Sequence, residues 1–370
     1  MTETIAIALS GGVDSMTAAY LLKKEGHSVF GIHFLTGFEA STGFNREEQD
    51  APEIPKPGSR ERLPLSAHPV RQVARQLNIP IHILDIRSEF KRHVVDYFVQ
   101  EYRSGKTPNP CLVCNPSIKF GAVLSFAQTL GASRLATGHY AKLEMDEANR
   151  CRLLKGADPD KDQSYFLARL TQNQLRMASF PLGDYFKADV KALAKKVGLI
   201  PGVGHESQDI CFIREKTYGE FILSEGKISP EGGWIEDTGG KRLGRHNGLH
   251  RFTIGQRKGI NCPAARPYYV VRLDTLENKL IVGSGDDLLS ASCRVERINW
   301  IAEAPTAPIT ALIRIRYRHT AVPSTVIPIG RETAVVEFKE PQKAVTPGQG
   351  AVFYKGKEVL GGGWIASEKP

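Results

Sequence analysis

The strongest constraint on the fold is a regular alternation of strand-like and helix-like segments in the first half of the chain. IAIAL at residues 5–9 is a short apolar strand, and the turn SGGVDS at 10–15 separates it from a helical segment that ends near Gly26. Further strand-like segments lie at 29–35, 81–86 and 134–138, and segments with helical periodicity lie at 70–77, 90–102 and 117–131. This alternation predicts an α/β fold with a doubly wound parallel sheet.

The second half of the chain has a different pattern. Beyond about residue 215, short alternating strands with many glycines follow one another, as in LDTLENKLIVG and AVFYKGKEVLGGG. This pattern predicts a small central domain followed by a C-terminal β-barrel. We therefore expect three domains, at residues 1–208, 209–283 and 284–370, and a long loop at 38–67, where prolines and charges show no period.

Composition narrows the class of protein. The 370 residues are 41% hydrophobic and 24% charged, which is typical of a globular chain. The first residues lack a basic region and a long apolar run, so we expect neither a signal peptide nor a membrane partner, and a cytoplasmic location. In a reducing compartment, six cysteines favour buried, metal-binding or catalytic roles over disulfides. The net charge of +9 weakly favours a polyanionic partner such as a nucleic acid.

The turn SGGVDS is the strongest single motif. Backbone N–H groups of a glycine-rich turn at the start of a helix converge on an anion, and glycines let the backbone approach a phosphate closely. The turn lacks the Gly-Lys-Ser/Thr ending of a P-loop kinase or GTPase, so it does not indicate transfer of a γ-phosphate. In isolation, the same residues would also suit a tight connection without a ligand.

Taken with other motifs, SGGVDS resembles the phosphate loop of the adenylating ATP pyrophosphatases, and the whole chain resembles the tRNA-specific 2-thiouridylase family. The matching motifs occur in order along nearly the entire chain: SGGVDS, TPNPCLVCN (107–115), IKFG (118–121), ATGHY (136–140), KDQSYFL (161–167), DICFI (209–213), TIGQRKG (253–259), RYRHT (316–320) and TPGQGAVFY (346–354). The resemblance implies an enzyme that adenylates the C2 oxygen of the wobble uridine of tRNA with ATP, releasing pyrophosphate. Sulfur then displaces AMP and leaves 2-thiouridine.

The resemblance also implies an ATP site. A uracil carbonyl oxygen is a very poor leaving group until it becomes a phosphate ester, so the loop would hold the pyrophosphate while that ester forms. Asp14 would be a ligand of Mg²⁺, which would share the negative charge. The implied ATP-binding residues are Ala8, Leu9, Ser10, Gly11, Gly12, Val13, Asp14, Ser15, Phe34 and Gly138.

Two cysteines carry the sulfur chemistry by resemblance. Cys211 would receive a persulfide sulfur from a donor protein, and Cys114 would complete the transfer. A sulfide source is the alternative supply of sulfur. A disulfide between these two cysteines is the expected by-product, which a reductant would reopen. Without the resemblance, the apolar neighbours of Cys211 would suit an inert core cysteine equally well.

Cys111 departs from the family pattern, because many members carry Asp at this position. The segment Asn109, Pro110 and Cys111 approaches the target base by resemblance, and a carboxylate there could act as an acid or base, as a thiol cannot. Cys111, Cys114 and Cys211 could instead hold a 4Fe-4S cluster with one open iron that carries sulfide. Zinc is a weaker alternative because no fourth ligand is evident, and Cys111 could also be a loop residue without a ligand role.

Basic segments in the second half predict contact with the tRNA. Residues 241–258 contain six Lys or Arg and no Asp or Glu. In IRIRYRH, Arg314, Arg316 and Arg318 alternate with apolar residues, so we expect a strand with one basic face. The wobble uridine of the anticodon stem-loop would leave its stack to enter the site. By resemblance, the tRNA-binding residues are His139, Lys161, Asp162, Gln163, Arg316, Tyr317 and Gln349.

Two other classes of protein share part of these features. Another adenylating ligase, such as an argininosuccinate synthase or an amidotransferase-type synthetase, would have the loop but would not need paired cysteines. A non-catalytic RNA-binding iron–sulfur protein would not need an intact SGGVDS.

Overall fold

A computed structural model describes residues 2–38, 69–202, 210–213, 217–227, 229–263 and 265–367. The chain forms two compact units, Met1–His93 with Cys114–Arg214, and Val94–Val113 with Glu215–Pro370. The boundaries between the units run through the helical segments η1 (Lys91–Val95) and α5 (Cys111–Cys114). Apart from Phe38, the predicted loop at 38–67 lies outside the described residues.

The first unit contains the predicted parallel sheet. Its strand order is β3-β2-β1-β4-β7, and each neighbouring pair is parallel. Because β1 has β2 on one side and β4 on the other, the chain winds outward in both directions from β1, which confirms the doubly wound topology. The strands are β1 (Thr4–Ala8), β2 (Ser28–Leu35), β3 (Ile81–Asp85), β4 (Arg134–Ala136) and β7 (Ala178–Ser179).

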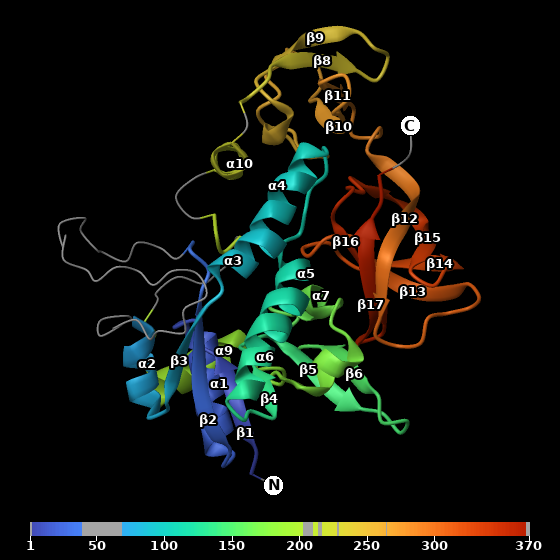
Figure 1. Cartoon of the computed structure of the whole chain (residues 1–370). Helices are drawn as coiled ribbons and strands as arrows, with labels where there is room; N and C mark the ends of the chain where they lie inside the picture. The colour runs from blue at the N-terminus through green and yellow to red at the C-terminus, as the bar shows by residue number, and fades with distance from the viewer. Residues whose placement is uncertain are drawn as a thin grey trace, which may run out of the picture. The chain divides into compact units, whose positions relative to one another are not determined.

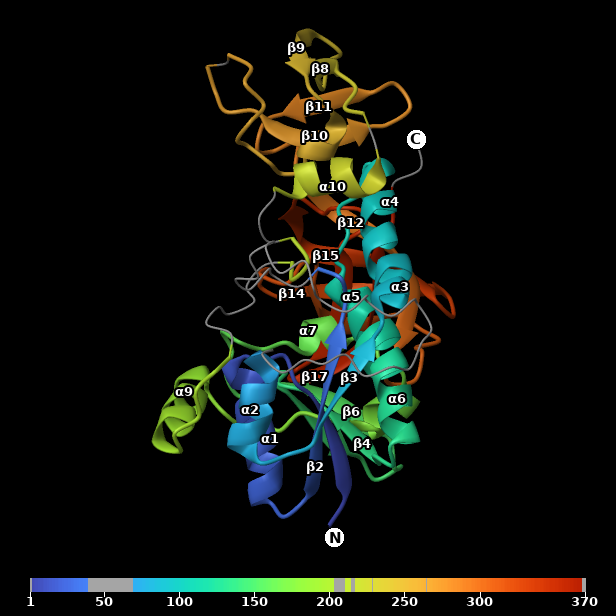
Figure 2. The same cartoon turned by 60° about the vertical axis from the view of Figure 1, so that its left-hand side comes forward.

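Helices cover both faces of this sheet (Figures 1 and 2). On one face, Ile5 and Ile7 of β1 join a buried cluster with residues of α1 (Val13–Lys24), α2 (Pro69–Leu77) and α9 (Lys187–Lys196). On the other face lies α6 (Leu124–Thr129), with Ala127 fully buried. The near-continuous apolar sequence of β1 follows from this arrangement, because a strand covered on both faces has no side facing water.

Two predicted helices differ from the structure at their ends and in their hydrogen bonding. The helix predicted at 90–102 begins at Arg87 and runs through α3 (Arg87–Phe90), η1 and α4 (Asp96–Arg103). The helix predicted at 117–131 begins at α5 and runs through η2 (Asn115–Val123) to the end of α6 at Thr129. Both η1 and η2 are π-helical, and η2 begins next to Pro116, which has no N–H to donate. The cysteine pair therefore lies at the start of the helical segment, before residue 117, at which the sequence predicted it to begin.

The remaining elements of the first unit are short. A hairpin of β5 (Ala141–Met145) and β6 (Cys151–Lys155) follows the sheet strand β4. The helices α7 (Ser164–Leu167) and α8 (Gln172–Arg176) come next, and α8 begins with a capping box formed by Thr171 and Gln174.

The second unit contains a small four-stranded sheet of order β10-β11-β8-β9. One face packs around a small core of Ile235, Phe252, Val270, Leu280 and Val282. The unit also includes α4 and α10, whose Phe98 and Phe221 rings lie 6.2 Å apart. The elements are α10 (Tyr218–Gly226), β8 (Gly233–Asp237), β9 (Arg242–His246), η3 (Leu249–Arg251), β10 (Tyr269–Asp274) and β11 (Lys279–Gly283).

The last part of the second unit is a closed barrel (Figure 1, orange to red). Its strands follow the order β12-β15-β14-β13-β16-β17, and an antiparallel pairing of β17 with β12 closes it. This confirms the predicted C-terminal β-barrel, and closure removes the exposed edges of an open sheet. The strands are β12 (Leu289–Trp300), β13 (Ile309–Arg314), β14 (Val322–Gly330), β15 (Thr333–Lys343), β16 (Gly350–Lys355) and β17 (Glu358–Ile365).

The prediction of a long basic strand in IRIRYRH is wrong. Strand β13 ends at Arg314, and residues 315–319 form a turn in which the His319 N–H donates to the Arg316 carbonyl at 3.0 Å. Ile315 is nevertheless buried and Arg316 and Arg318 are exposed. Alternating polarity thus indicated which side chains are exposed, but it could not distinguish a strand from a turn.

Among the described residues, no helix is long and apolar enough to cross a membrane.

The barrel core depends on large buried side chains, among which Phe353 is fully buried. Phe353→Ala should lower the free energy of unfolding of the second unit by about 3–5 kcal/mol, because it removes buried apolar surface and leaves a cavity. Leu276→Ala in the β10–β11 turn is the matched control, since that side chain is 93% exposed. Thermal unfolding measures both variants, and an equal effect of the two would contradict the assignment of the core.

Candidate active site

The predicted phosphate loop connects β1 to the first turn of α1. Gly11 has a φ of 86°, a conformation that glycine adopts without strain, and Gly12 is the N-cap of α1. The hydroxyls of Ser10 and Ser15 lie 3.1 Å apart, and the Ser10 N–H donates to Ser15 Oγ at 3.2 Å. The loop is therefore held closed by its own serines, with the helix N-terminus at its centre, which is an arrangement suited to an anion.

Asp14 in the first turn of α1 is held by two residues distant in sequence. Both carboxylate oxygens lie 2.7 Å from Nζ of Lys187, and the hydroxyl of Tyr140 donates to Oδ1 at 2.8 Å. The Lys187 side chain is only 9% exposed and is the first residue of α9. The backbone N–H of Lys187 donates to Asp158 at 2.9 Å, which fixes the start of that helix. A buried cation therefore lies beside the phosphate loop.

Gly138 lies against the same helix turn. A Cβ at this position would come within 2.9 Å of Asp14 C and Ser15 N, so no side chain fits without a shift of the backbone. The residue follows β4, whereas the loop follows β1, and these neighbouring strands of the doubly wound sheet end at the same edge. Ligands of such sheets bind at this kind of position, between strands from which the chain departs in opposite directions.

The other predicted ATP-binding residues lie at this edge or just before it. Ala8 ends β1, Leu9 is buried, and the Leu9 N–H donates to the Ile32 carbonyl at 2.8 Å. Phe34 is half-buried near the end of β2. Their roles remain predictions, but the sheet brings this set together with Gly138 around one helix N-terminus.

His139 lies in a buried network next to Gly138. Its ring is 8% exposed, its Nδ1 lies 2.6 Å from Thr137 Oγ1, and its Nε2 lies 3.2 Å from Nζ of Lys119. Burial, and then the nearby Lys119 ammonium, hold the pKa of His139 well below its usual range, so the ring is neutral at pH 7. Because the ammonium can only donate, Nε2 accepts and Nδ1 carries the proton toward Thr137. The predicted contact of His139 with tRNA stays a prediction.

The paired cysteines lie on one short helix. Cys111 and Cys114 are the first and last residues of α5, and both are half-buried. Residues three apart on a helix share a face, so the two thiols project to the same side. Asn115 anchors the next turn by donating from Nδ2 to the Phe166 carbonyl at 3.0 Å.

Cys211 is exposed, which excludes the interpretation of this residue as an inert core cysteine. Its neighbour Phe212 is 5% exposed and contacts the rings of Phe38 and Phe90, with centroids 6.0 and 5.8 Å away. The apolar residue thus anchors the segment, and the thiol next to it faces outward. A thiol that must receive sulfur from another molecule requires this exposure.

The remaining cysteines differ from these three. Burial raises the pKa of Cys151 and Cys262, and it raises the pKa of Cys293 to about 12, so all three remain thiols at neutral pH. Among the described residues, no three His, Cys, Asp or Glu side chains lie close enough together to hold a metal ion. A 4Fe-4S cluster on Cys111, Cys114 and Cys211 stays a prediction.

The predicted tRNA-binding residues of the first unit have internal partners. Asp162 is 4% exposed and accepts from the N–H groups of Gly156 and Ser164. Gln163 accepts from the Tyr140 N–H at 3.1 Å, and so supports the residue that binds Asp14. Lys161 is half-buried.

In the second unit, the predicted residues lie on barrel loops. Arg316 is exposed, and Tyr317 lies under the Arg314 guanidinium at 5.4 Å. Gln349 donates from Nε2 to the carbonyls of Thr107 at 2.9 Å and Pro108 at 3.4 Å. Gln349 therefore holds the segment that precedes Asn109, Pro110 and Cys111.

The sequence did not identify three residues of the site, which are Lys119, Tyr140 and Lys187. Tyr140 and Lys119 stand inside the motifs ATGHY and IKFG, so their neighbours were identified but their own contacts were not. Nothing near Lys187 distinguishes it from the other lysines of α9, since its role depends on a contact with a residue 173 positions earlier.

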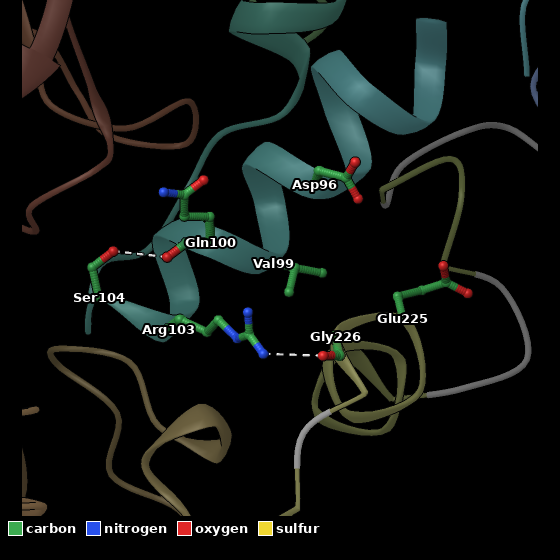
Figure 3. A pocket seen from close by; sticks show the side chains of 7 residues that line it. All are labelled: Asp96, Val99, Gln100, Arg103, Ser104, Glu225 and Gly226. Atoms are coloured by element: carbon green, nitrogen blue, oxygen red, sulfur yellow. Dashed lines mark hydrogen bonds between the residues drawn. The ribbon is translucent and has the colours of Figure 1, made fainter. Parts of the chain in front are cut away.

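The structure also contains a cavity of about 680 Å³ between α4 and α10, in the second unit (Figure 3). Asp96 and Glu225 line it, and Arg103 donates to the Gly226 carbonyl at 3.1 Å. None of the predicted site residues is among its lining residues. The candidate site is therefore the phosphate loop and the residues around it, and not this cavity.

Family models match the chain in three consecutive parts. They carry the descriptions tRNA methyl transferase HUP domain over residues 3–215, tRNA methyl transferase PRC-barrel domain over 220–284 and aminomethyltransferase beta-barrel domain over 290–365.

Curated relatives match over nearly the whole length. The chain is 48% identical over 364 residues to the tRNA-specific 2-thiouridylase MnmA of Desulfosudis oleivorans, with 98% of this chain and 95% of the relative covered. It is 46% identical to the protein of that name from Geotalea uraniireducens, over 98% and 95% of the two chains, and 41% identical to that of Nostoc punctiforme, over 98% and 99%. A solved NMN synthetase structure from Francisella tularensis matches with 12% identity over 61% of this chain and 78% of its own, and with a TM-score of 0.34, too low to support an argument.

The low pKa of His139 predicts a pH dependence of stability. In the unfolded chain the imidazole titrates near 6.5, so below that pH the unfolded state binds a proton that the folded state does not. Stability should be unaffected by this group above pH 6.5 and should fall by up to about 1.4 kcal/mol per pH unit as the pH drops toward the lower folded-state pKa. His139→Gln should remove this part of the dependence, measured as Tm between about pH 7.5 and 5. If the wild type and His139→Gln lost the same Tm between these two pH values, this result would contradict a buried neutral histidine at position 139.

Proposed function

The chain belongs to the tRNA-specific 2-thiouridylase family, and on that premise we propose how its residues make 2-thiouridine in tRNA. It is a tRNA-uridine 2-sulfurtransferase of the α/β type with a barrel at its C-terminus. Although the family models are described as methyl transferase domains, methyl transfer would need neither a phosphate loop nor paired cysteines. The observation that carries the proposal is the closed loop at the head of α1 with the buried Lys187 beside it.

The first step of the proposal is adenylation of the wobble uridine. The C2 oxygen attacks the α-phosphate of ATP, the bond to the β-phosphate breaks, and pyrophosphate leaves. The N–H groups at the start of α1 and the Lys187 ammonium stabilise the charge on the departing pyrophosphate. Gly138 provides the space for the nucleotide, because a side chain there would already collide with Asp14.

The resemblance also implies Mg²⁺ in this step. Asp14 is the predicted ligand, but both of its oxygens already contact Lys187. As it stands, the carboxylate does not offer a prepared magnesium site, so we derive no step through the metal.

The second step is sulfur transfer by Cys211 and Cys114. The terminal sulfur of a persulfide on Cys211 attacks C2, and AMP leaves with the electron pair of the C2–O bond. The Cys114 thiolate then attacks Cys211 Sγ. This breaks the bond between Cys211 Sγ and the sulfur atom attached to C2, and 2-thiouridine is released. The two cysteines are left as a disulfide, and a thiol reductant supplies two electrons to restore them. The exposure of Cys211 supports its place as the acceptor of a persulfide sulfur from a sulfur-donor protein, whereas a sulfide source would serve only the open iron of a cluster.

An iron–sulfur mechanism is the second candidate, because Cys111 and Cys114 share one face of α5. Two thiols at this spacing can bind one metal centre, and Cys211 would provide the third ligand. The persulfide scheme needs no metal ion, and for that reason we prefer it.

The substrate partner in this proposal is the anticodon stem-loop of tRNA, and the exposed Arg316 supports contact with its phosphates. A cytoplasmic location remains a prediction. The two rival classes are disfavoured for different reasons. A different adenylating ligase leaves the exposed Cys211 without a role, and a non-catalytic scaffold leaves the Asp14–Lys187 pair without one.

Lys187→Met tests the adenylation step. Incubated with ATP and unmodified tRNA, this variant should release pyrophosphate about 100-fold more slowly, because a preorganised cation is lost from the site of developing charge. Lys195→Met is the control, since Lys195 is an exposed lysine on the same helix. Wild-type protein that releases no tRNA-dependent pyrophosphate, or releases it only with an added amino acid, would refute the proposed function.

Cysteine variants test the sulfur step. Cys114→Ser and Cys211→Ser should abolish thiolated tRNA, separated on mercury-containing gels, while pyrophosphate release continues. Cys262→Ala is the control. Cys111→Ala distinguishes the two mechanisms: retained thiolation supports the persulfide scheme. Loss of thiolation together with loss of iron and sulfide from anaerobically purified protein would instead support the cluster.

A further inference from the structure

The small sheet of the second unit has one face packed on its core and one face that carries charged side chains. Ile235, Leu280 and Val282 are buried on the inner face. By the alternation of side chains along β8, Trp234 and Glu236 project to the opposite, outer face. Lys279 of β11 is opposite Trp234 in the parallel pairing, and Arg245 of β9 is opposite it in the antiparallel pairing.

A β-bulge brings a second arginine to this outer face. Arg242 and Arg245 are three residues apart, so in a regular strand they would project to opposite faces. The register of β8 with β9 shifts at Leu243, since Ile235 is opposite Gly244 and Glu236 is opposite Arg242. The extra residue resets the alternation, and Leu243 packs against the core while both arginines face outward.

The two guanidinium groups lie over the same indole ring. Their Cζ atoms are 4.5 Å (Arg242) and 4.6 Å (Arg245) from the centroid of the Trp234 ring. This contact restrains two flexible side chains while leaving their N–H edges able to donate. Pairs of N–H groups held in a plane match the oxygens of a phosphate.

Acidic neighbours only partly neutralise this face. Glu236 is 7% exposed, and its carboxylate pairs with two cations. Arg242 Nε lies 3.6 Å from Oε1, and Lys279 Nζ lies 3.3 Å from Oε2. Glu277 pairs with Lys279 at 2.6 Å. Arg245 is exposed and has no acidic partner among the residues that the structure describes. Arg242, itself 61% exposed, has only a long contact with a carboxylate that it shares.

We propose that Arg242 and Arg245, oriented by Trp234, form a binding site for the phosphate backbone of tRNA, separate from the residues that contact the reacting uridine. This inference rests on the proposed function for the identity of the polyanion. The ligand chemistry is a phosphodiester chain, because two restrained guanidinium groups on an exposed face complement its charge and the covered indole leaves little ring surface for a base. The adjoining segment to Lys258 carries no acidic residue, so the favourable potential extends beyond the pair.

The test measures binding of unmodified tRNA without ATP or sulfide, at salt concentrations from about 50 to 300 mM. The double variant Arg242→Glu/Arg245→Glu should raise the dissociation constant about tenfold or more and should reduce the slope of log K against log salt by about 2. Trp234→Ala keeps both charges, so the slope should stay unchanged while affinity falls a few-fold. Arg331→Glu/Lys357→Glu has the same change of charge on exposed turns of the barrel and should have a much smaller effect.

Equal affinity and slope for the double variant and its barrel control would overturn the inference, and would leave an acidic protein as the remaining partner for this face. The variants are compared by thermal unfolding, and Arg242→Gln/Arg245→Gln replaces the double variant if that one has a lower Tm. Because no chemistry occurs in this assay, a wild-type protein that binds tRNA but does not thiolate it would refute the proposed function without affecting this site.

Discussion

The structure of the candidate site depends on the ion pair between Asp14 and Lys187. It connects the first turn of α1 to the first residue of α9, two helices that pack on the same face of the parallel sheet. Burying an ammonium without a partner costs several kcal/mol, so the pair fixes the start of both helices relative to each other. Tyr140 and Gln163 extend the connection to the segments after β4 and β6. The phosphate loop is thereby held in shape before any ligand binds, as efficient electrostatic stabilisation requires.

Two kinds of cysteine environment follow from how the chain packs. Cys151 and Cys293 lie in apolar surroundings that raise the pKa of each thiol and so suppress reactivity. Cys211 is next to a buried phenylalanine and yet exposed. The same apolar neighbours that suggested a core position from the sequence serve instead to anchor a segment that presents its thiol to solvent.

Regular alternation predicted most of the fold, because apolar periodicity reflects which face of a strand or helix is buried. Its failures have specific physical causes. Alternating burial continues past the end of β13 into a turn, so Arg316 was placed on a strand that ends at Arg314. In β9 a bulge places two arginines three residues apart on one face, which a period of two excludes. The helix predicted from residue 117 begins earlier, since Cys111–Cys114 is already helical.

The sequence by itself determined the sheet topology class and the barrel, because their apolar patterns are encoded in residues close together in the chain. The phosphate loop and the two sulfur-transfer cysteines were assigned by resemblance to the family. Only the tertiary structure decided that Lys187 neutralises Asp14, that Gln349 holds the segment before Cys111, and that His139 is a buried neutral ring beside Lys119. These contacts join residues 20 to 242 positions apart. Local propensity and periodicity do not report which distant side chains will meet, since that is settled by the packing of whole elements against one another.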